Sequence, residues 1–116
     1  MFFLLDLAML LLLGEDERNG SISKDIYAQR VNSNGNSLWT TNGIAISTAD
    51  NDQHDLKLCN TNIGGAIITW EDKRSGIYYD IYAQLINSNG QIQWAQNGVI
   101  VSNAKNNQKS PAICSD

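Results

Sequence analysis

Proline, cysteine, histidine and basic residues are all scarce in this sequence. Its 116 residues include one proline, two cysteines and one histidine, and eight basic residues stand against twelve acidic ones, for a net charge of −4. A weakly acidic chain without a Lys/Arg cluster lacks the basic patch that neutralises nucleic-acid phosphates. We therefore expect no nucleic-acid partner.

The motifs that hold metals or cofactors are also missing. Cys59 and Cys114 have no CxxC or CxxH spacing, so they do not predict a zinc site. They occupy the same place in successive copies of the repeat described below, and we interpret them as small buried thiols at equivalent core positions, with a disulfide between them as the alternative. The Asn-Ser-Asn-Gly segments at 32–35 and 87–90 offer neutral amides, whereas Ca²⁺ prefers carboxylates. No metal and no cofactor are predicted.

The N-terminal segment 1–14 is apolar and is interrupted by Asp6. The segment is too short to span a bilayer, which needs about 20 apolar residues. It has the length of a signal-peptide core, but no Lys or Arg precedes it. We expect either a signal-like segment or a degenerate strand of an earlier repeat, and no membrane span.

The most informative feature is an internal repeat, because Asp25 recurs as Asp80 and 80 − 25 = 55. The segment 25–59 aligns without a gap to 80–114, with 17 identities in 35 positions. The shared residues include Asp-Ile-Tyr-Ala-Gln at 25–29 and 80–84, and Trp39 with Trp94. The match extends backwards, because Glu15 to Gly20 corresponds to Glu71 to Gly76, with one extra residue before Asp25. In this alignment Gly14 stands where the second copy has Trp70.

Each repeat is predicted to contain four short antiparallel strands. The expected strands are 56–60, 66–70, 77–86 and 91–95, with 112–115 as the counterpart of the first. They are rich in β-branched and aromatic residues and separated by Asn and Gly turns. In 87–90 we expect Asn-Gly to supply the positive φ angles of a tight hairpin. No segment beyond the N-terminal one has helical apolar spacing.

An all-β repeat of this length with four strands predicts β-propeller blades. We expect an incomplete propeller of about two blades: an apolar segment at 1–14, the end of one blade at 15–55, a complete blade at 56–103 and the first strand of the next at 104–116. Two blades cannot close a ring. The expected partners are further blades of a parent protein, or copies of this chain.

The segment Trp70-Glu71-Asp72-Lys73-Arg74-Ser75-Gly76, followed by Asp-Ile-Tyr-Ala-Gln at 80–84, gives a family resemblance. It resembles the propeller-like W-x-D-x-R-x-G…D-I-Y-A-Q repeats of large secreted or surface microbial proteins. The resemblance implies an extracellular or cell-surface location. It is also distantly similar to sialidase propellers, although their Ser-x-Asp-x-Gly-x-Thr-Trp box is absent.

Most chemically active side chains recur with the repeat. Glu71, Asp72, Arg74 and Asp80 have counterparts in Glu15, Asp16, Arg18 and Asp25, so we interpret them as loop-forming residues rather than a glycosidase pair. Trp39 and Trp94 share one position, which favours packing between blades.

The residues that do not recur are the better candidates for a specific role. Tyr78 and Tyr79 belong to one repeat only and are predicted to form an exposed contact. His54 is replaced by Lys109 in the second copy, and we expect it in a solvated loop without a catalytic role.

The sequence thus predicts a non-enzymatic repeat module for scaffolding or recognition, with carbohydrate or protein as ligand. The alternatives are a fragment of a sialidase-like or glycoside-hydrolase-like enzyme, and a non-functional gene fragment.

Overall fold

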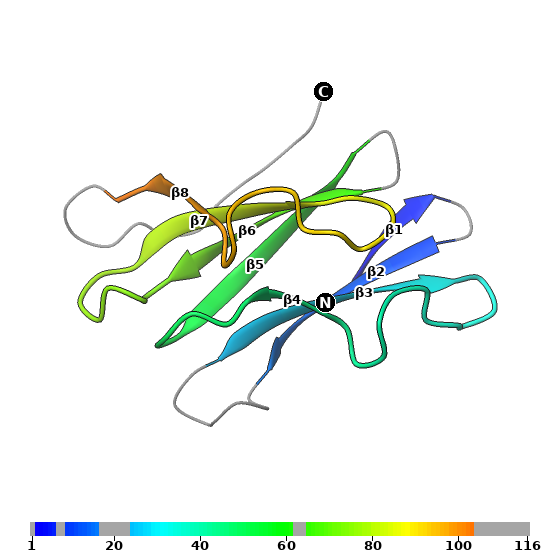
Figure 1. The fold of residues 1–116 in the computed structure, drawn as a ribbon, viewed down its shortest axis with the longest axis horizontal. Coiled ribbons are helices and arrows are strands. Elements are labelled where there is room, and N and C mark those ends of the chain that lie inside the picture. Colours follow the sequence, from blue (N-terminus) through cyan, green and yellow to red (C-terminus); the bar gives the residue numbers. More distant parts are fainter. Residues whose placement is uncertain (1, 7–8, 17–23, 62–64, 104–116) are drawn as a thin grey trace.

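The computed structural model describes residues 2–6, 9–16, 24–61 and 65–103, and within them the protein is all-β. Its strands form two four-stranded antiparallel sheets (Figure 1). The first sheet contains β1 (Phe2–Asp6), β2 (Met9–Asp16), β3 (Asp25–Asn32) and β4 (Ile44–Ser47), and the second contains β5 (Gln53–Asn60), β6 (Ala66–Asp72), β7 (Asp80–Ile86) and β8 (Val99–Ser102). No helix capable of crossing a membrane occurs in these residues.

In both sheets the strands are neighbours in the order of the chain. The pairing is also equivalent, because Ile26 faces Ser47 in the first sheet and Ile81 faces Ser102 in the second, each next to a bulge. The register of β2 places Gly14 opposite Tyr27, at the position where Trp70 faces Tyr82. The described residues of the apolar N-terminal segment, 2–6 and 9–14, therefore take backbone positions equivalent to those of β5 and β6.

A glutamine on the third strand of each sheet organises the loop that follows. The Gln84 side chain is buried, accepts hydrogen bonds from the backbone N–H groups of Leu85 and Trp94 at 3.0 Å, and donates one to the Ala95 carbonyl at 2.7 Å. Gln29 makes the same three bonds in the first sheet. Because one amide satisfies three backbone groups, the loop keeps its shape without being a strand.

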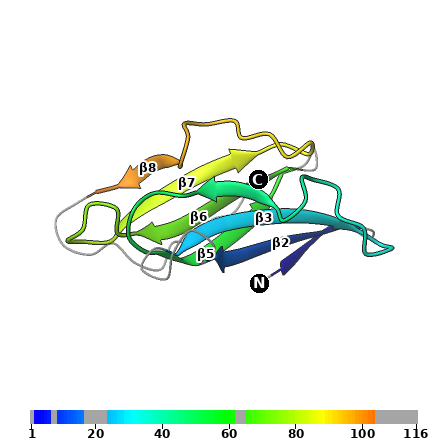
Figure 2. The ribbon, with the colours of Figure 1, turned by 60° about the horizontal axis from the view of Figure 1, so that its bottom comes forward.

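The two sheets pack face to face around one hydrophobic core (Figure 2). The first sheet contributes Ile26, Ala28 and Ile46, and the second contributes Leu56, Leu58, Ala66, Ile68, Trp70 and Ile86. Along each strand the core residues are spaced two apart, as expected for side chains that share one face of a sheet.

Several strand predictions differ from the structure. The segment 91–95 is predicted to be a strand, but only Ile92 forms an isolated bridge, to Ile86, and the fourth strand is β8. Trp94 is tied to Gln84 instead of to a neighbouring strand, which explains the error. The strand predicted at 77–86 begins only at Asp80, and the one predicted at 112–115 lies outside the described residues.

The Asn-Ser-Asn-Gly turns also differ in detail from the expectation. Asn87 accepts a backbone hydrogen bond from Gly90 at 3.0 Å, and its side chain accepts bonds from the backbone of Asn89 and Gln91. Within the turn only Gly90 has a positive φ, of 81°. The turn is therefore stabilised by an asparagine side chain and a single glycine, and the same bonds recur around Asn32.

The cysteine positions and the segment boundary expected from the sequence can be compared with the fold. The expectation of a buried core thiol is wrong for Cys59, which is half-buried and lies outside the core because it alternates with the core residue Leu58 along β5. Cys114 lies outside the described residues. The first sheet ends at Ser47 and the second begins at Gln53, so the boundary expected at 55/56 falls within β5.

Candidate functional site

Asp72 and Arg74 form an ion pair at the end of β6. The Arg74 guanidinium donates to both Asp72 carboxylate oxygens, from Nε at 2.9 Å and from Nη2 at 2.6 Å. The Trp70 indole N–H and the Arg74 backbone N–H also donate to this carboxylate. Asp72 is fully buried, so all four donors compensate for the lost hydration of its charge.

The same arginine connects the two sheets. Its Nη2 reaches the carbonyl oxygen of Asn97 at 2.6 Å and the hydroxyl of Ser47, on the first sheet, at 3.5 Å. The guanidinium carbon also lies 3.7 Å from the centre of the Tyr82 ring, in a cation–π contact. Arg74 therefore holds the β6–β7 loop, the loop before β8 and the end of β4 together.

The linker between the sheets is held by Gln53. This buried side chain donates to the carbonyls of Ala49, Asp50 and Asn51 at 2.8–3.2 Å. Its oxygen accepts a hydrogen bond from the Ser47 hydroxyl at 3.3 Å. This amide thus bonds three of the residues that connect β4 to β5.

The acidic residues of the repeat motif are buried or engaged in contacts within the fold. Asp72 has no exposed surface and both its oxygens are engaged, while Glu71 is also buried. Asp80 lies half-buried at the start of β7, opposite Asp72. A glycosidase pair needs carboxyl groups that reach a bound sugar, and Asp72 is not accessible to one.

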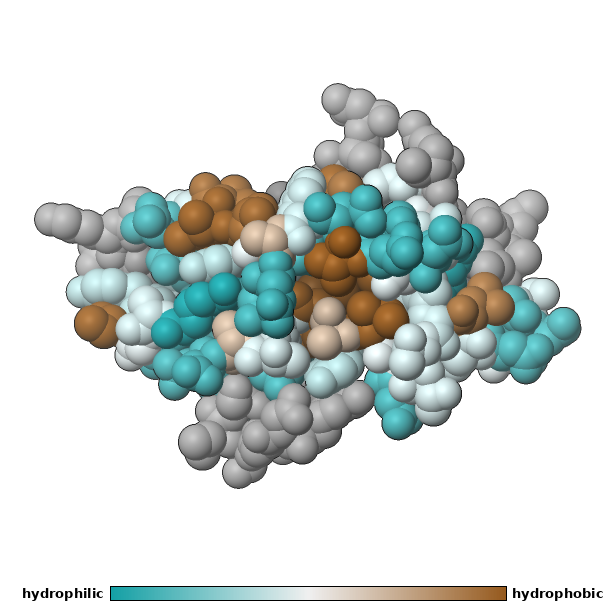
Figure 3. Space-filling view, viewed as in Figure 1, coloured by the Kyte–Doolittle hydropathy of each residue, from teal (hydrophilic) through white to brown (hydrophobic). Residues whose placement is uncertain are grey.

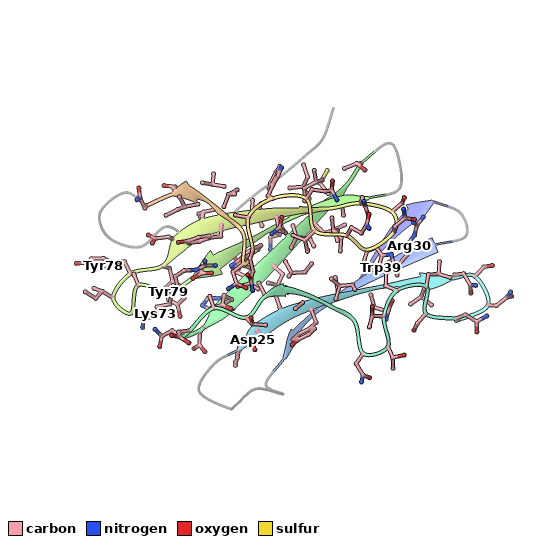
Figure 4. All side chains as sticks on the ribbon, viewed as in Figure 1. Asp25, Arg30, Trp39, Lys73, Tyr78 and Tyr79 are labelled. Atoms are coloured by element: carbon pink, nitrogen blue, oxygen red, sulfur yellow. The ribbon has the colours of Figure 1, made fainter. Side chains whose placement is uncertain are left out.

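A second cluster, which we call the hairpin patch, consists of His54, Lys73, Tyr78 and Tyr79. The His54 ring meets the Tyr79 ring edge-on, with centroids 4.6 Å apart. The Lys73 ammonium lies 5.5 Å from the centre of the Tyr79 ring, and Figure 4 shows these two residues at the same end of the molecule. Tyr78 lies at the tip of the hairpin and is 44% exposed. The three residues that do not recur in the repeat therefore belong to one end of the second sheet.

The expectation for His54 is corrected by this arrangement. It lies half-buried on strand β5, not in a solvated loop, and its Nδ1 is 3.8 Å from the Glu71 carboxylate. Burial raises the pKa of Tyr79 above its usual value, and the nearby Asp52 and Glu71 add to the effect. The tyrosine hydroxyl is thus kept protonated beside two carboxyl groups.

Next to the patch, Asp55 occupies a bulge in β5 with a positive φ of 57°. A hydrogen bond with Glu71 holds the pKa of Asp55 below its usual value of 3.8, and Lys57, whose ammonium lies 3.2 Å away, lowers it further. Aspartate tolerates this left-handed conformation better than most residues. The bulge therefore brings the Asp55 carboxyl group within hydrogen-bonding reach of Glu71.

A cavity of about 270 Å³ lies where the two sheets meet. Its walls combine apolar side chains, amides and a hydroxyl: Ala45, Ile46, Thr48, Ile92, Trp94, Gln96 and Asn97. Trp94 is 39% exposed. A flat aromatic ring beside amide groups is a surface on which a polar ligand with an apolar face, such as a sugar, can bind.

Trp39 and Trp94, which share one position in the repeat, have different surroundings. The Trp39 indole N–H and the Arg30 guanidinium both donate to the Ser88 carbonyl at 3.0 Å, across the junction between the sheets (Figure 4). The Trp39 ring also covers Gly90, where an added Cβ would lie 2.8 Å from it. Trp39 therefore packs between the two sheets, whereas Trp94 retains an exposed surface.

Gln53 and Gln84 are buried amides that sequence reasoning missed. Their recurrence as Gln108 and Gln29 was the available signal, because a glutamine repeated at one position of a strand is most simply a hydrogen-bonding residue. Among the residues that the structure describes, no group of three metal-ligating side chains could hold an ion.

Comparisons of this chain with known protein families, with curated proteins and with solved structures gave no match.

Proposed function

We propose that this chain is a pair of β-propeller-type blades, serving as a non-enzymatic scaffold or recognition module of a larger secreted or surface protein. The observation that carries the proposal is the equivalence of the two sheets. They have the same strand order, the same bulge and the same glutamine-centred loop at positions one repeat apart. Four-stranded antiparallel units that pack face on face are the units of a propeller.

The packing of the sheets supports a repeating array. The face of the second sheet with Trp70 and Tyr82 contacts the face of the first sheet with Ile26 and Ile46. The two contacting faces are not equivalent positions of the repeat. The other face of each sheet is therefore equivalent to the face that its neighbour uses in the contact. Such a contact is repeated from unit to unit in an array.

The charged residues of the repeat motif support a non-enzymatic role. The Asp72 carboxylate is buried and bound by Arg74, and Arg74 in turn bonds the Asn97 carbonyl and the Ser47 hydroxyl of the first sheet, so both side chains have a structural role. We expect no hydrolysis of fluorogenic sialosides or glucosides above the buffer rate. Turnover that is abolished by Glu71→Gln would contradict this part of the proposal.

The hairpin patch is the proposed contact for a carbohydrate or protein ligand. Its tyrosines and its histidine are specific to one repeat, and Tyr78 combines an exposed ring with a hydrogen-bonding hydroxyl. Aromatic side chains of this kind supply a large contact area at low entropic cost.

A fusion of two full chains in frame tests the repeat module. If the units pack as blades, the fusion unfolds in a single transition at a higher temperature than one chain, because the new interface stabilises both copies. Two copies that unfold independently, at the temperature of the single chain, would contradict the proposal. Differential scanning calorimetry distinguishes the two results.

A further inference from the structure

The internal junction between the sheets shows what covers one face of a repeat. Ile46, on β4, is 1% exposed because the second sheet lies over it, whereas its counterpart Val101, on β8, is 62% exposed. Ser47 is completely buried, and its counterpart Ser102 is half-buried. Figure 3 shows hydrophobic side chains gathered over the β8 edge, where Ile100 is also exposed.

The opposite side of the molecule has the complementary feature. Gly90, in the turn after β7, is covered by the Trp39 ring. Its counterpart Gly35 has the same backbone conformation, with φ of 84° against 81°. No atom of the described residues lies within 4 Å of the position that a Cβ on Gly35 would take. The turn after β3 is thus shaped to receive a tryptophan that the described part of the chain does not supply.

Trp94 is the counterpart of Trp39, the tryptophan that covers Gly90. Its backbone N–H is bound to Gln84 at 3.0 Å, as that of Trp39 is bound to Gln29. The two tryptophans therefore start from the same backbone position, from which a change of side-chain rotamer reorients the Trp94 ring.

We propose that copies of this chain associate head to tail, the β7–β8 face of one copy covering the Tyr27 side of the first sheet of the next. Trp94 of one copy lies on Gly35 of the other and donates its indole N–H to the Ser33 carbonyl, as Trp39 does to Ser88. This inference rests on the proposed function, because it extends the observed contact between repeats to separate chains.

Two differences make the contact between chains weaker than the internal one. Leu85 stands where the first repeat has Arg30, so the second donor to the turn carbonyl is lost. Gly14 stands opposite Tyr27 where Trp70 faces Tyr82, so the acceptor face lacks the buried tryptophan of the core. The association is therefore reversible and depends on concentration.

A complementation experiment with two variants tests the polarity of the contact. Trp94→Ala removes the donor ring, and Gly35→Asn places a side chain on the acceptor turn while keeping a residue that tolerates a positive φ. Each variant alone should associate about tenfold or more weakly than the wild type, because a central tryptophan carries much of an interface's energy. An equimolar mixture retains one intact donor and one intact acceptor, and should form one-to-one dimers that do not grow further.

Sedimentation velocity over a wide concentration range gives the size distribution, and near-ultraviolet circular dichroism verifies the fold of each variant. Ile77→Ser, at a 70% exposed position on the β6–β7 hairpin, is the control and should associate like the wild type. Val101→Glu places a charge on the exposed face and should abolish association. It tests the contact independently of the Trp94→Ala and Gly35→Asn variants. Gly14→Trp should strengthen it.

A monomeric wild type at all concentrations, or a mixture that stays monomeric although the wild type associates, overturns the inference. If the fused chains nevertheless unfold cooperatively, the repeat module stands and only the association of separate chains is wrong. If the fusion also unfolds as independent copies, both proposals fail.

Discussion

The β3–β4 region and the β7–β8 region have the same register and much of the same sequence, yet they differ in exposure. Asp25, Ile26 and Ile46 are almost fully buried in the first, whereas Asp80 and Ile81 are half-buried and Val101 is exposed in the second. The difference comes from what lies on each face, since among the described residues only the β3–β4 region is covered by another sheet. Burial in this fold is thus a property of the neighbouring unit as much as of the sequence.

The largest expected effect comes from removing the ion pair that joins the regions. Asp72→Ala leaves Arg74 and the Trp70 indole without their buried acceptor, and breaking a buried pair costs about 3–5 kcal/mol of unfolding free energy. Urea denaturation measures the loss. Asp80→Ala, at the half-buried position opposite, is the control and should be much milder; equal losses would contradict the structural role of Asp72.

The burial contrast itself is tested by matched truncations on β4 and β8. Ile46→Ala creates a cavity in the core and should lower the unfolding free energy by about 2–5 kcal/mol. Val101→Ala removes an exposed side chain and should change it by about 0.5 kcal/mol or less at concentrations where the chain is monomeric. A large loss at Val101 in the monomer would show that its face is covered within the same chain.

The two turns offer a smaller and more local contrast. Gly90→Asn forces the Trp39 ring away from its contact, since an added Cβ lies 2.8 Å from it, and should cost about 1–3 kcal/mol. Gly35→Asn meets no described atom and should cost about 1 kcal/mol or less. Thermal unfolding of the pair provides the comparison, and equal shifts would mean that Trp39 does not pack on the turn.

The smallest expected effect concerns acid stability. The pKa of Asp55 is lower in the folded protein than its usual value of 3.8, so the folded state binds fewer protons than the unfolded one in this range. Stability from Asp55 is therefore present above about this pH and lost as the pH falls through the folded-state pKa. Asp55→Asn should lower the urea midpoint at neutral pH and reduce its decline in acid.

Asp50→Asn, at an exposed position of the linker, serves as the control for loss of one carboxylate. The same acid dependence in Asp55→Asn and wild type would show that the bulge carboxylate does not couple to folding.

The sequence predicted the all-β class and most of the strands correctly, because period-two patterns and Asn-Gly punctuation are local signals. It failed at 91–95, which was predicted to return as a strand after the Asn-Gly turn. The backbone partner of Trp94 is instead the side chain of Gln84, which also binds the carbonyl of Ala95. Such side-chain bonds have no periodic pattern. Strand β8 was missed because the prediction assigned its place beside β7 to the segment 91–95.

The site was less accessible to sequence reasoning. His54, Tyr78 and Tyr79 were singled out because they do not recur in the repeat. The contact between His54 and Tyr79 was not predicted. The bulge at Asp55 shifts the register of β5 between His54 and Lys57, so the neighbours of His54 cannot be counted along an ideal strand. Asp55 and Gln53 acquire their partners only when β5 is paired and the linker is folded.

The linker held by Gln53 has a geometric consequence. Its amide binds three successive carbonyls and the last residue of β4, and thereby constrains the path of the chain from one sheet to the next. Gln108 places the same residue after the second sheet. In an array that repeats this step the rotation from one sheet to the next would recur at every unit, and its size would determine how many units complete a full turn. The curvature of such an array would then depend in part on one buried side chain per repeat.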